Sequence, residues 1–222
     1  DVYKRQIVGY TNAGKSTLFN RMTESDVLVE NQLFATLDST VRKLELGEGH
    51  SALMSDTVGF VRRLPHELVD AVRSTLEEVN EADLLIHVVD AADEAPDRQI
   101  AAVRQVLDEI GAGDVPELLI INKLDVATPE AVRRLRSLHP DSAAVSASTG
   151  EGVGDVVAAI VAALEARTVE LELLVPYDKG DVVAALHRDG HVLSQEHADG
   201  GTHLKVRLPA EDAYRFTNYT PP

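Results

Sequence analysis

The chain has 222 residues, of which 44% are hydrophobic and none is cysteine, and its formal net charge is −16 at pH 7. This composition allows a normal core and excludes disulfides and thiolate metal sites. The acidity excludes a basic nucleic-acid footprint, and no apolar run approaches the roughly 18 residues that span a bilayer. We expect a cytoplasmic protein, and a monomer, with no membrane association and no direct sequence-specific binding of DNA.

The first motif, Gly9 to Thr17, reads GYTNAGKST and fits the pattern G-x-x-x-x-G-K-[ST]. Its two glycines let the backbone turn so that successive N–H groups face a phosphate chain. Lys15 can reach the β- and γ-phosphates, the Ser16 hydroxyl can ligate Mg²⁺, and a helix is predicted over 15–22. A plain glycine turn before a helix is the competing interpretation. The predicted phosphate site consists of Gly9, Tyr10, Thr11, Asn12, Ala13, Gly14, Lys15, Ser16 and Thr17.

The residues before this loop fit a buried strand poorly. Such a loop normally follows a parallel strand of continuous Val, Ile and Leu, and here only Ile7 and Val8 match. Residues 4–6 (KRQ) would place polar groups in the centre of the sheet. We interpret residues 1–6 as non-native sequence. The alternative is an outlying strand end with its charges at an exposed tip.

A second phosphate-site signal follows two predicted strands. The first begins within 41–46, and the second, 51–55 (SALMS), leads directly to Asp56-Thr57-Val58-Gly59. Asp56 can hold Mg²⁺ through water, and the Gly59 N–H can sense a γ-phosphate. The pattern D-x-x-G alone marks many ordinary turns. Its position at a strand end after a phosphate loop makes it informative.

Helices are predicted over 66–81 and 96–110, with a buried strand between them at 84–89 (LLIHVV). Their apolar residues recur at helical spacing, whereas the strand is continuously apolar. His87 in that strand is interpreted as a core histidine rather than a catalytic group, because the sequence shows no partner for it.

The base-selecting motif follows the apolar strand predicted at 117–121 and reads Asn122-Lys123-Leu124-Asp125, the pattern N-K-x-D. An aspartate at the Watson–Crick edge of guanine accepts from both N1–H and the 2-amino group. Adenine offers neither donor, so a site built on this carboxylate rejects ATP. Asn122 is expected to stabilise the loop and to reach the base, and the stem of Lys123 to pack over its plane. The motif therefore predicts GTP and GDP as ligands.

The last part of the nucleotide domain continues the alternation of helix and strand. A helix is predicted over 129–138 after an N-cap at Thr128, then a strand at 143–145 and a helix at 152–166. The loop after that strand, Ser146, Ala147 and Ser148, can present the Ala147 N–H to guanine O6. The predicted architecture is a doubly wound, mostly parallel α/β sheet in a domain spanning 1–168.

Residues 169–222 are predicted to form a small α+β C-terminal domain. Strands are expected at 169–175, 191–197 and 202–208, with a short helix at 180–187. Four histidines in this segment match no usual metal-site spacing, and we do not predict a metal site there: His187, His191, His197 and His203.

With its motifs in this order, the chain is similar to a translation-factor-class GTPase. The segments FATLDST at 34–40 and DTVGFVRRLPHELVDAVRSTLEE at 56–78 resemble the HflX family of Obg-like GTPases, over residues 7 to about 210. The resemblance implies a cytoplasmic, ribosome-associated GTPase that binds the large ribosomal subunit and splits or rescues stalled ribosomes. It also implies that Thr36 is the switch threonine that closes on Mg²⁺ and the γ-phosphate. The family usually has proline where this chain has Ser39, and we expect a fragment that lacks the family's N-terminal domain.

The predicted reaction is attack of water on the γ-phosphate, with Lys15, Thr36 and Gly59 as the catalytic residues. Many GTPases position that water with a glutamine directly after D-x-x-G, whereas this chain has Phe60. We therefore expect slow intrinsic hydrolysis that a partner accelerates. The alternatives are a GTP-gated binding module with negligible catalysis and another Obg-like GTPase. An ATPase is disfavoured by Asp125.

Overall fold

A computed structural model of the chain describes residues 4–23, 40–47, 50–56 and 79–221. The chain divides into two compact units, which span 2–161 and 162–222. The first unit contains a six-stranded sheet and the second a three-stranded sheet.

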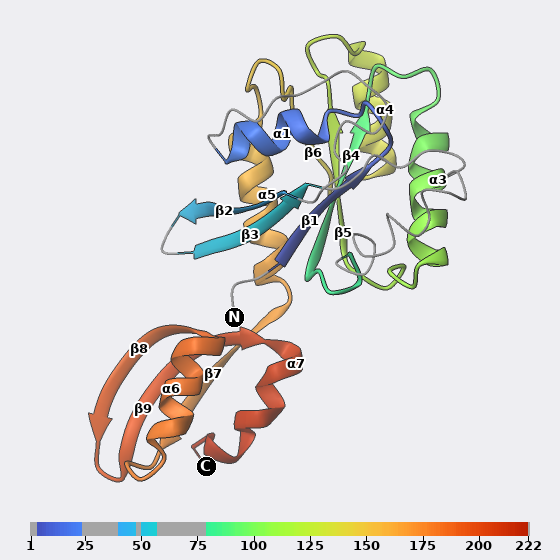
Figure 1. Cartoon of the computed structure of the whole chain (residues 1–222). Coiled ribbons are helices and arrows are strands. Elements are labelled where there is room, and N and C mark those ends of the chain that lie inside the picture. Colours follow the sequence, from blue (N-terminus) through green and yellow to red (C-terminus); the bar gives the residue numbers. More distant parts are fainter. Residues whose placement is uncertain (1–3, 24–39, 48–49, 57–78, 222) are drawn as a thin grey trace. The chain divides into compact units, whose positions relative to one another are not determined.

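The first sheet has the strand order β2-β3-β1-β4-β5-β6, and every neighbouring pair is parallel except β2 with β3. Its strands are β1 (Lys4–Gly9), β2 (Thr40–Gly47), β3 (His50–Asp56), β4 (Leu84–Asp90), β5 (Glu117–Asn122) and β6 (Ala143–Ala144). The described helices are α1 (Lys15–Met22), α3 (Pro96–Glu109), α4 (Pro129–Leu138) and α5 (Val153–Glu165) (Figure 1). This is the doubly wound, mostly parallel α/β architecture that the sequence predicts.

Helices cover both faces of this sheet because the central strands are apolar on both sides. Val8 and Leu85 pack against Val103 of α3, and Ile121 packs in a cluster with Leu135 of α4. Successive strand residues point to opposite faces, so the residues between these face the side on which α1 and α5 lie (Figure 1). The parallel strands bring their carboxyl ends to one edge of the sheet, where ligands of this architecture bind.

Strand β1 differs from the sequence-based expectation. The three polar residues 4–6 continue the strand, pairing with β3 on one side and β4 on the other. Arg5 and Gln6 are buried, at 1% and 3% exposure, and Lys4 is exposed. The expected exposed tip is therefore wrong for Arg5, because backbone pairing on both sides holds these positions in the sheet despite their polarity. The non-native origin of residues 1–6 stays a prediction.

The second unit is an antiparallel sheet of order β7-β9-β8 with helices packed on it. Its elements are β7 (Thr168–Val175), α6 (Gly180–Asp189), β8 (His191–Ala198), β9 (Gly201–Pro209), α7 (Ala210–Ala213) and the 3₁₀ helix η1 (Tyr214–Tyr219). Its core joins Leu186 of α6 and Phe216 of η1 to apolar residues of β7 and β9. The predicted strands and helix are confirmed, whereas the sequence pattern does not indicate α7 or η1, because helices of four and six residues are too short for a periodic signal.

Several expectations fall on residues that are not described. Thr36, Ser39, Gly59 and Phe60 lie outside the described residues, as does the helix predicted over 66–81 except for its end.

Candidate nucleotide-binding site

The loop between β1 and α1 has the backbone that its glycines predict. Gly9 and Gly14 have φ of 150° and 94°. A Cβ at Gly9 would lie 2.4 Å from the carbonyl oxygen of Val88, and one at Gly14 would lie 2.3 Å from Asn122 Nδ2. Contacts this close leave no room for a side chain, so both glycines let the loop approach its neighbouring strands.

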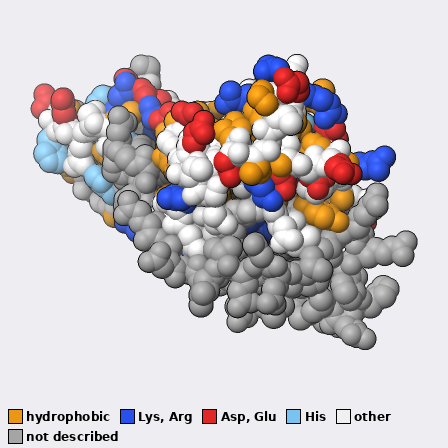
Figure 2. Space-filling model, turned by 90° about the horizontal axis from the view of Figure 1, so that it is seen from above, with side chains coloured by type: hydrophobic (Ala, Val, Ile, Leu, Met, Phe, Trp, Pro, Cys, Tyr) orange, Lys and Arg blue, Asp and Glu red, His pale blue; other side chains and the backbone are white. Residues whose placement is uncertain are grey.

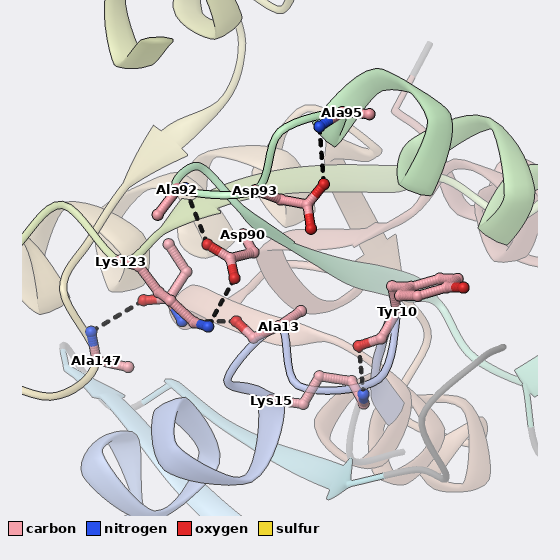
Figure 3. Close-up of polar contacts among 10 residues, drawn as sticks. Tyr10, Ala13, Lys15, Asp90, Ala92, Asp93, Ala95, Lys123 and Ala147 are labelled. Carbon is pink, nitrogen blue, oxygen red and sulfur yellow. Dashed lines mark hydrogen bonds and ion pairs between the residues drawn. The ribbon is translucent and has the colours of Figure 1, made fainter. Parts of the chain in front are cut away.

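Lys15 begins α1 and turns back over the loop. Its side chain is 6% exposed, and Nζ donates to the carbonyl oxygens of Gly9 and Tyr10, both at 3.1 Å. Figure 3 shows the Tyr10 carbonyl directed to this ammonium and the Tyr10 ring pointing away from it. Burial lowers the pKa of Lys15 to about 8, against the opposing effect of Asp56. The buried cation would be stabilised by an anion bound in the loop.

Ser16 and Asp56 form the second polar pair at this edge of the sheet. Asp56 is the last residue of β3, pairs with Ile7 of β1 and is buried. The Ser16 hydroxyl donates to Asp56 Oδ2 at 2.6 Å. A hydroxyl and a carboxylate oxygen in contact are hard oxygen ligands of the kind that Mg²⁺ takes beside phosphates and water. The two predicted metal ligands that are described therefore lie together.

Asn122 joins the phosphate loop to the loop that follows β6. It ends β5, is 1% exposed, and donates from Nδ2 to the Ala13 carbonyl oxygen at 2.8 Å. Its Oδ1 accepts from the Ala147 N–H at 3.0 Å. These contacts agree with the expected stabilising role of Asn122. The Ala147 N–H, which the sequence predicts as a donor to guanine O6, donates to Asn122 Oδ1 in this structure.

Asp125 is held in place by two serines of that same loop. Its Oδ1 accepts from the Ser146 hydroxyl at 2.7 Å and its Oδ2 from the Ser148 hydroxyl at 2.9 Å. These two hydrogen bonds lower the pKa of Asp125, so the group is ionised at neutral pH. The side chain is exposed. It is therefore an oriented carboxylate acceptor open to a ligand with two adjacent donors, as the edge of guanine has.

Two functional contacts were missed by the sequence reasoning. Arg21, in the last turn of α1, donates from Nε to the Ala147 carbonyl oxygen at 3.3 Å and from Nη2 to that of Ser148 at 2.5 Å. Asp90, at the end of β4, accepts from Lys123 Nζ at 2.6 Å (Figure 3). Neither Arg21 nor Asp90 belongs to a sequence motif, because each contacts a residue far from it in the sequence. An ionisable residue ending an apolar strand was the one available signal for Asp90.

His87 lies in the core of the sheet, as expected. It is fully buried in β4, and its Nδ1 is 2.6 Å from Glu117 Oε1. Arg104 donates to the same carboxylate at 2.8 Å. Burial lowers the pKa of His87, opposed by the hydrogen bond to Glu117, so we take the ring as neutral. A neutral imidazole that donates to Glu117 places no charge in the core, and the Glu117 carboxylate is paired with the partly exposed Arg104.

The described part of the chain has neither a clustered metal site nor a membrane-spanning helix. It holds no group of three or more His, Asp or Glu residues that could bind a metal. Its helices include none long and apolar enough to cross a membrane. On the face drawn in Figure 2, basic and acidic side chains of the described residues alternate, so no continuous basic patch is seen there.

Comparison with known proteins gives matches along most of the chain. The family model described as 50S ribosome-binding GTPase matches residues 5–123, and the HflX C-terminal domain matches residues 132–218. GTPase HflX of Akkermansia muciniphila is 46% identical over 208 residues, covering 91% of this chain and 48% of that protein. GTPase HflX of Escherichia coli is 39% identical over 224 residues, covering 100% of this chain and 53% of that protein.

A solved structure shows the same fold. The GTP-binding protein from the hyperthermophilic archaeon Sulfolobus solfataricus, in complex with GDP, is 25% identical with a TM-score of 0.59. That likeness covers 72% of this chain and 52% of the other. The chain spans about half the length of the curated relatives it matches. The sequence motifs, the fold and both family models agree, and the chain belongs to the HflX family of GTPases.

Proposed function

We propose that this protein binds GTP and GDP and hydrolyses GTP to GDP and phosphate. The observation that carries the proposal is the Asp125 carboxylate, oriented by Ser146 and Ser148 in a loop that Asn122 ties to the phosphate loop. A carboxylate presented in this way accepts from the two donors of guanine, whereas adenine would leave it without donors. Lys123 would cover the face of the base.

Mg²⁺ is the metal that the Ser16 and Asp56 pair would hold. Bound there with the phosphates, it would neutralise their charge. Lys15 would bind the β- and γ-phosphates through its ammonium and stabilise charge on them during attack by water. We propose Thr36 and Gly59 as the further γ-phosphate contacts, and slow intrinsic turnover because Phe60 has no group to orient water.

The large ribosomal subunit is the proposed partner. Support comes from the family model described as 50S ribosome-binding GTPase and from the relatives named GTPase HflX. We further propose a cytoplasmic location and a nucleotide domain over 1–168 followed by a separate C-terminal domain over 169–222.

The test is GTP turnover by the chain alone and with purified large subunits, with ATP as the competing substrate. We expect slow turnover alone, acceleration by orders of magnitude with subunits, and no use of ATP. Nucleotide-gated binding to subunits without acceleration would instead support a binding module. Fast turnover by the chain alone would contradict the role given to Phe60.

The base assignment has its own test in Asp125→Asn. The amide would keep one acceptor but add a donor, which matches the C2 carbonyl of xanthine and repels the 2-amino group of guanine. We expect loss of GDP binding and gain of XDP binding. Ser148→Ala, which removes one of the two orienting hydroxyls, should weaken GDP binding without creating a preference for XDP. Unchanged GDP affinity in Asp125→Asn would contradict the proposed site.

A further inference from the structure

Asp90 contributes a carboxylate beside the base-selecting motif that the proposed function leaves without a role. It ends β4 and pairs in register with Asn122, which ends β5. Its Oδ1 accepts from the Ala92 N–H at 2.9 Å, and its Oδ2 accepts from Lys123 Nζ at 2.6 Å. Figure 3 shows Lys123 reaching across from the next loop to this carboxylate. The pair is partly buried, with side-chain exposures of 33% for Lys123 and 16% for Asp90.

The backbone of Lys123 is also held in place, by a tight turn. Its φ is 69°, a left-handed conformation that is unfavourable for a residue with a side chain. Its carbonyl oxygen accepts from the N–H groups of Val126 at 3.1 Å and Ala127 at 2.9 Å. The aliphatic stem is therefore held at both ends, by the turn at its backbone and by Asp90 at its tip. Strained backbone of this kind persists where the surroundings over-determine it, often at ligand sites.

We propose that Asp90 is a positioning residue for base binding, which holds Lys123 so that its stem forms a flat platform for the face of guanine. The inference rests on the proposed function. It divides recognition of the base into two separate parts. Asp125 accepts from the N1–H and the 2-amino group at the edge of guanine. The Lys123 stem, positioned by Asp90, contacts the face of the base, and that contact does not depend on the 2-amino group.

An exposed ion pair with no role in binding is the ordinary alternative, and such pairs contribute little. Two features separate this pair from that class. Its carboxylate is only 16% exposed and is oriented by a second hydrogen bond, and its lysine sits in a strained turn within the N-K-x-D motif.

The test variant is Asp90→Asn, with Asp93→Asn as the matched control. Asparagine keeps an oxygen for the Ala92 N–H and removes the negative charge that holds Lys123. Asp93 makes the equivalent turn contact, accepting from the Ala95 N–H at 2.8 Å in the same loop (Figure 3). Calorimetry with GDP and with inosine diphosphate, which lacks the 2-amino group, measures both parts of recognition.

We expect Asp90→Asn to weaken the binding of GDP and of inosine diphosphate equally, by about tenfold, the factor that corresponds to 1.4 kcal/mol. The GDP affinity of Asp93→Asn should stay within about twofold of that of the unmodified chain, the effect of a surface change. GDP affinity unchanged in Asp90→Asn would overturn the proposal. A lost preference for GDP over inosine diphosphate would also overturn it, because Asp90 would then support the whole loop rather than Lys123.

Lys123→Met tests the same claim without altering β4. Methionine keeps an apolar stem but has no charge for Asp90 to hold, so Asp90→Asn should cause no further loss in that background. Equal losses in both backgrounds would overturn the proposal. If the unmodified chain bound no GDP, the proposed function itself would fail, and that failure is distinguishable from a failure of the role given to Asp90.

Discussion

Replacing Asn122 with alanine should destabilise the first unit and its ligand site together. The amide makes two buried hydrogen bonds, from Nδ2 to Ala13 and from the Ala147 N–H to Oδ1. Its removal leaves a backbone carbonyl and a backbone N–H buried without those partners. Each such group costs about 1–3 kcal/mol, so the free energy of unfolding should fall by roughly 2–6 kcal/mol.

The measurement is urea unfolding followed by circular dichroism, together with GDP affinity by calorimetry. A loss of this size moves the urea midpoint by on the order of 1 M. GDP binding should weaken by at least about tenfold, because Asn122 orders both loops that would contact the nucleotide. Asn122→Asp separates the two bonds, since a carboxylate still accepts from Ala147 but places a second acceptor against the Ala13 carbonyl.

The matched control is Asn80→Ala. Asn80 also donates through Nδ2 to a carbonyl oxygen, that of Ile110 at 2.9 Å, but it is exposed. Water can replace that bond, so the change should stay within about 0.5 kcal/mol. If Asn122→Ala kept the urea midpoint and GDP affinity of the unmodified chain, the bridging role would be refuted.

Three further changes test the surroundings of the site. Gly14→Ala should abolish GDP binding, because its Cβ would lie 2.3 Å from Asn122 Nδ2, whereas Gly154→Ala in α5 meets no atom within 4 Å and should stabilise by about 0.5–1 kcal/mol. The pKa of Lys15 is lowered to about 8, so its ammonium loses its charge above that pH in the protein without ligand. Pyrophosphate should therefore bind about tenfold more weakly at pH 9 than at pH 7, and its binding should take up protons, which calorimetry in two buffers measures. Arg21→Ala removes two contacts to the base loop and should weaken GDP by about fivefold, against no change for Arg133→Ala on the exposed face of α4.

Much of the fold could be predicted because its signals are local. Helix α4 spans the predicted residues 129–138, and the expected cap is present, with the Thr128 hydroxyl oxygen accepting from the Ala131 N–H at 3.3 Å. Apolar runs likewise located β4 and β5. Strand β1 could not be found in full, because its polar residues 4–6 are held by pairing with β3 and β4, which composition does not encode.

The same distinction applies to the site. The residues of the three motifs are consecutive in sequence, so spacing alone identified Lys15, Ser16 and Asp125. Arg21 and its partner Ser148 are 127 positions apart, and Asp90 and Lys123 are 33 apart. Each contact depends on how strands order themselves in the sheet, and residue spacing within one segment does not determine that order.

The two links to the loop after β6 have a joint consequence for binding. Asn122 ties the Ala147 N–H to the phosphate loop, and Arg21 ties the carbonyl oxygens of Ala147 and Ser148 to α1. Both therefore connect the peptide that orients Asp125 with the segment that would surround the phosphates. Groups that share contacts in one network do not respond independently to perturbation. Ordering of the phosphate loop and ordering of the base loop should thus reinforce each other through direct contacts within the first unit.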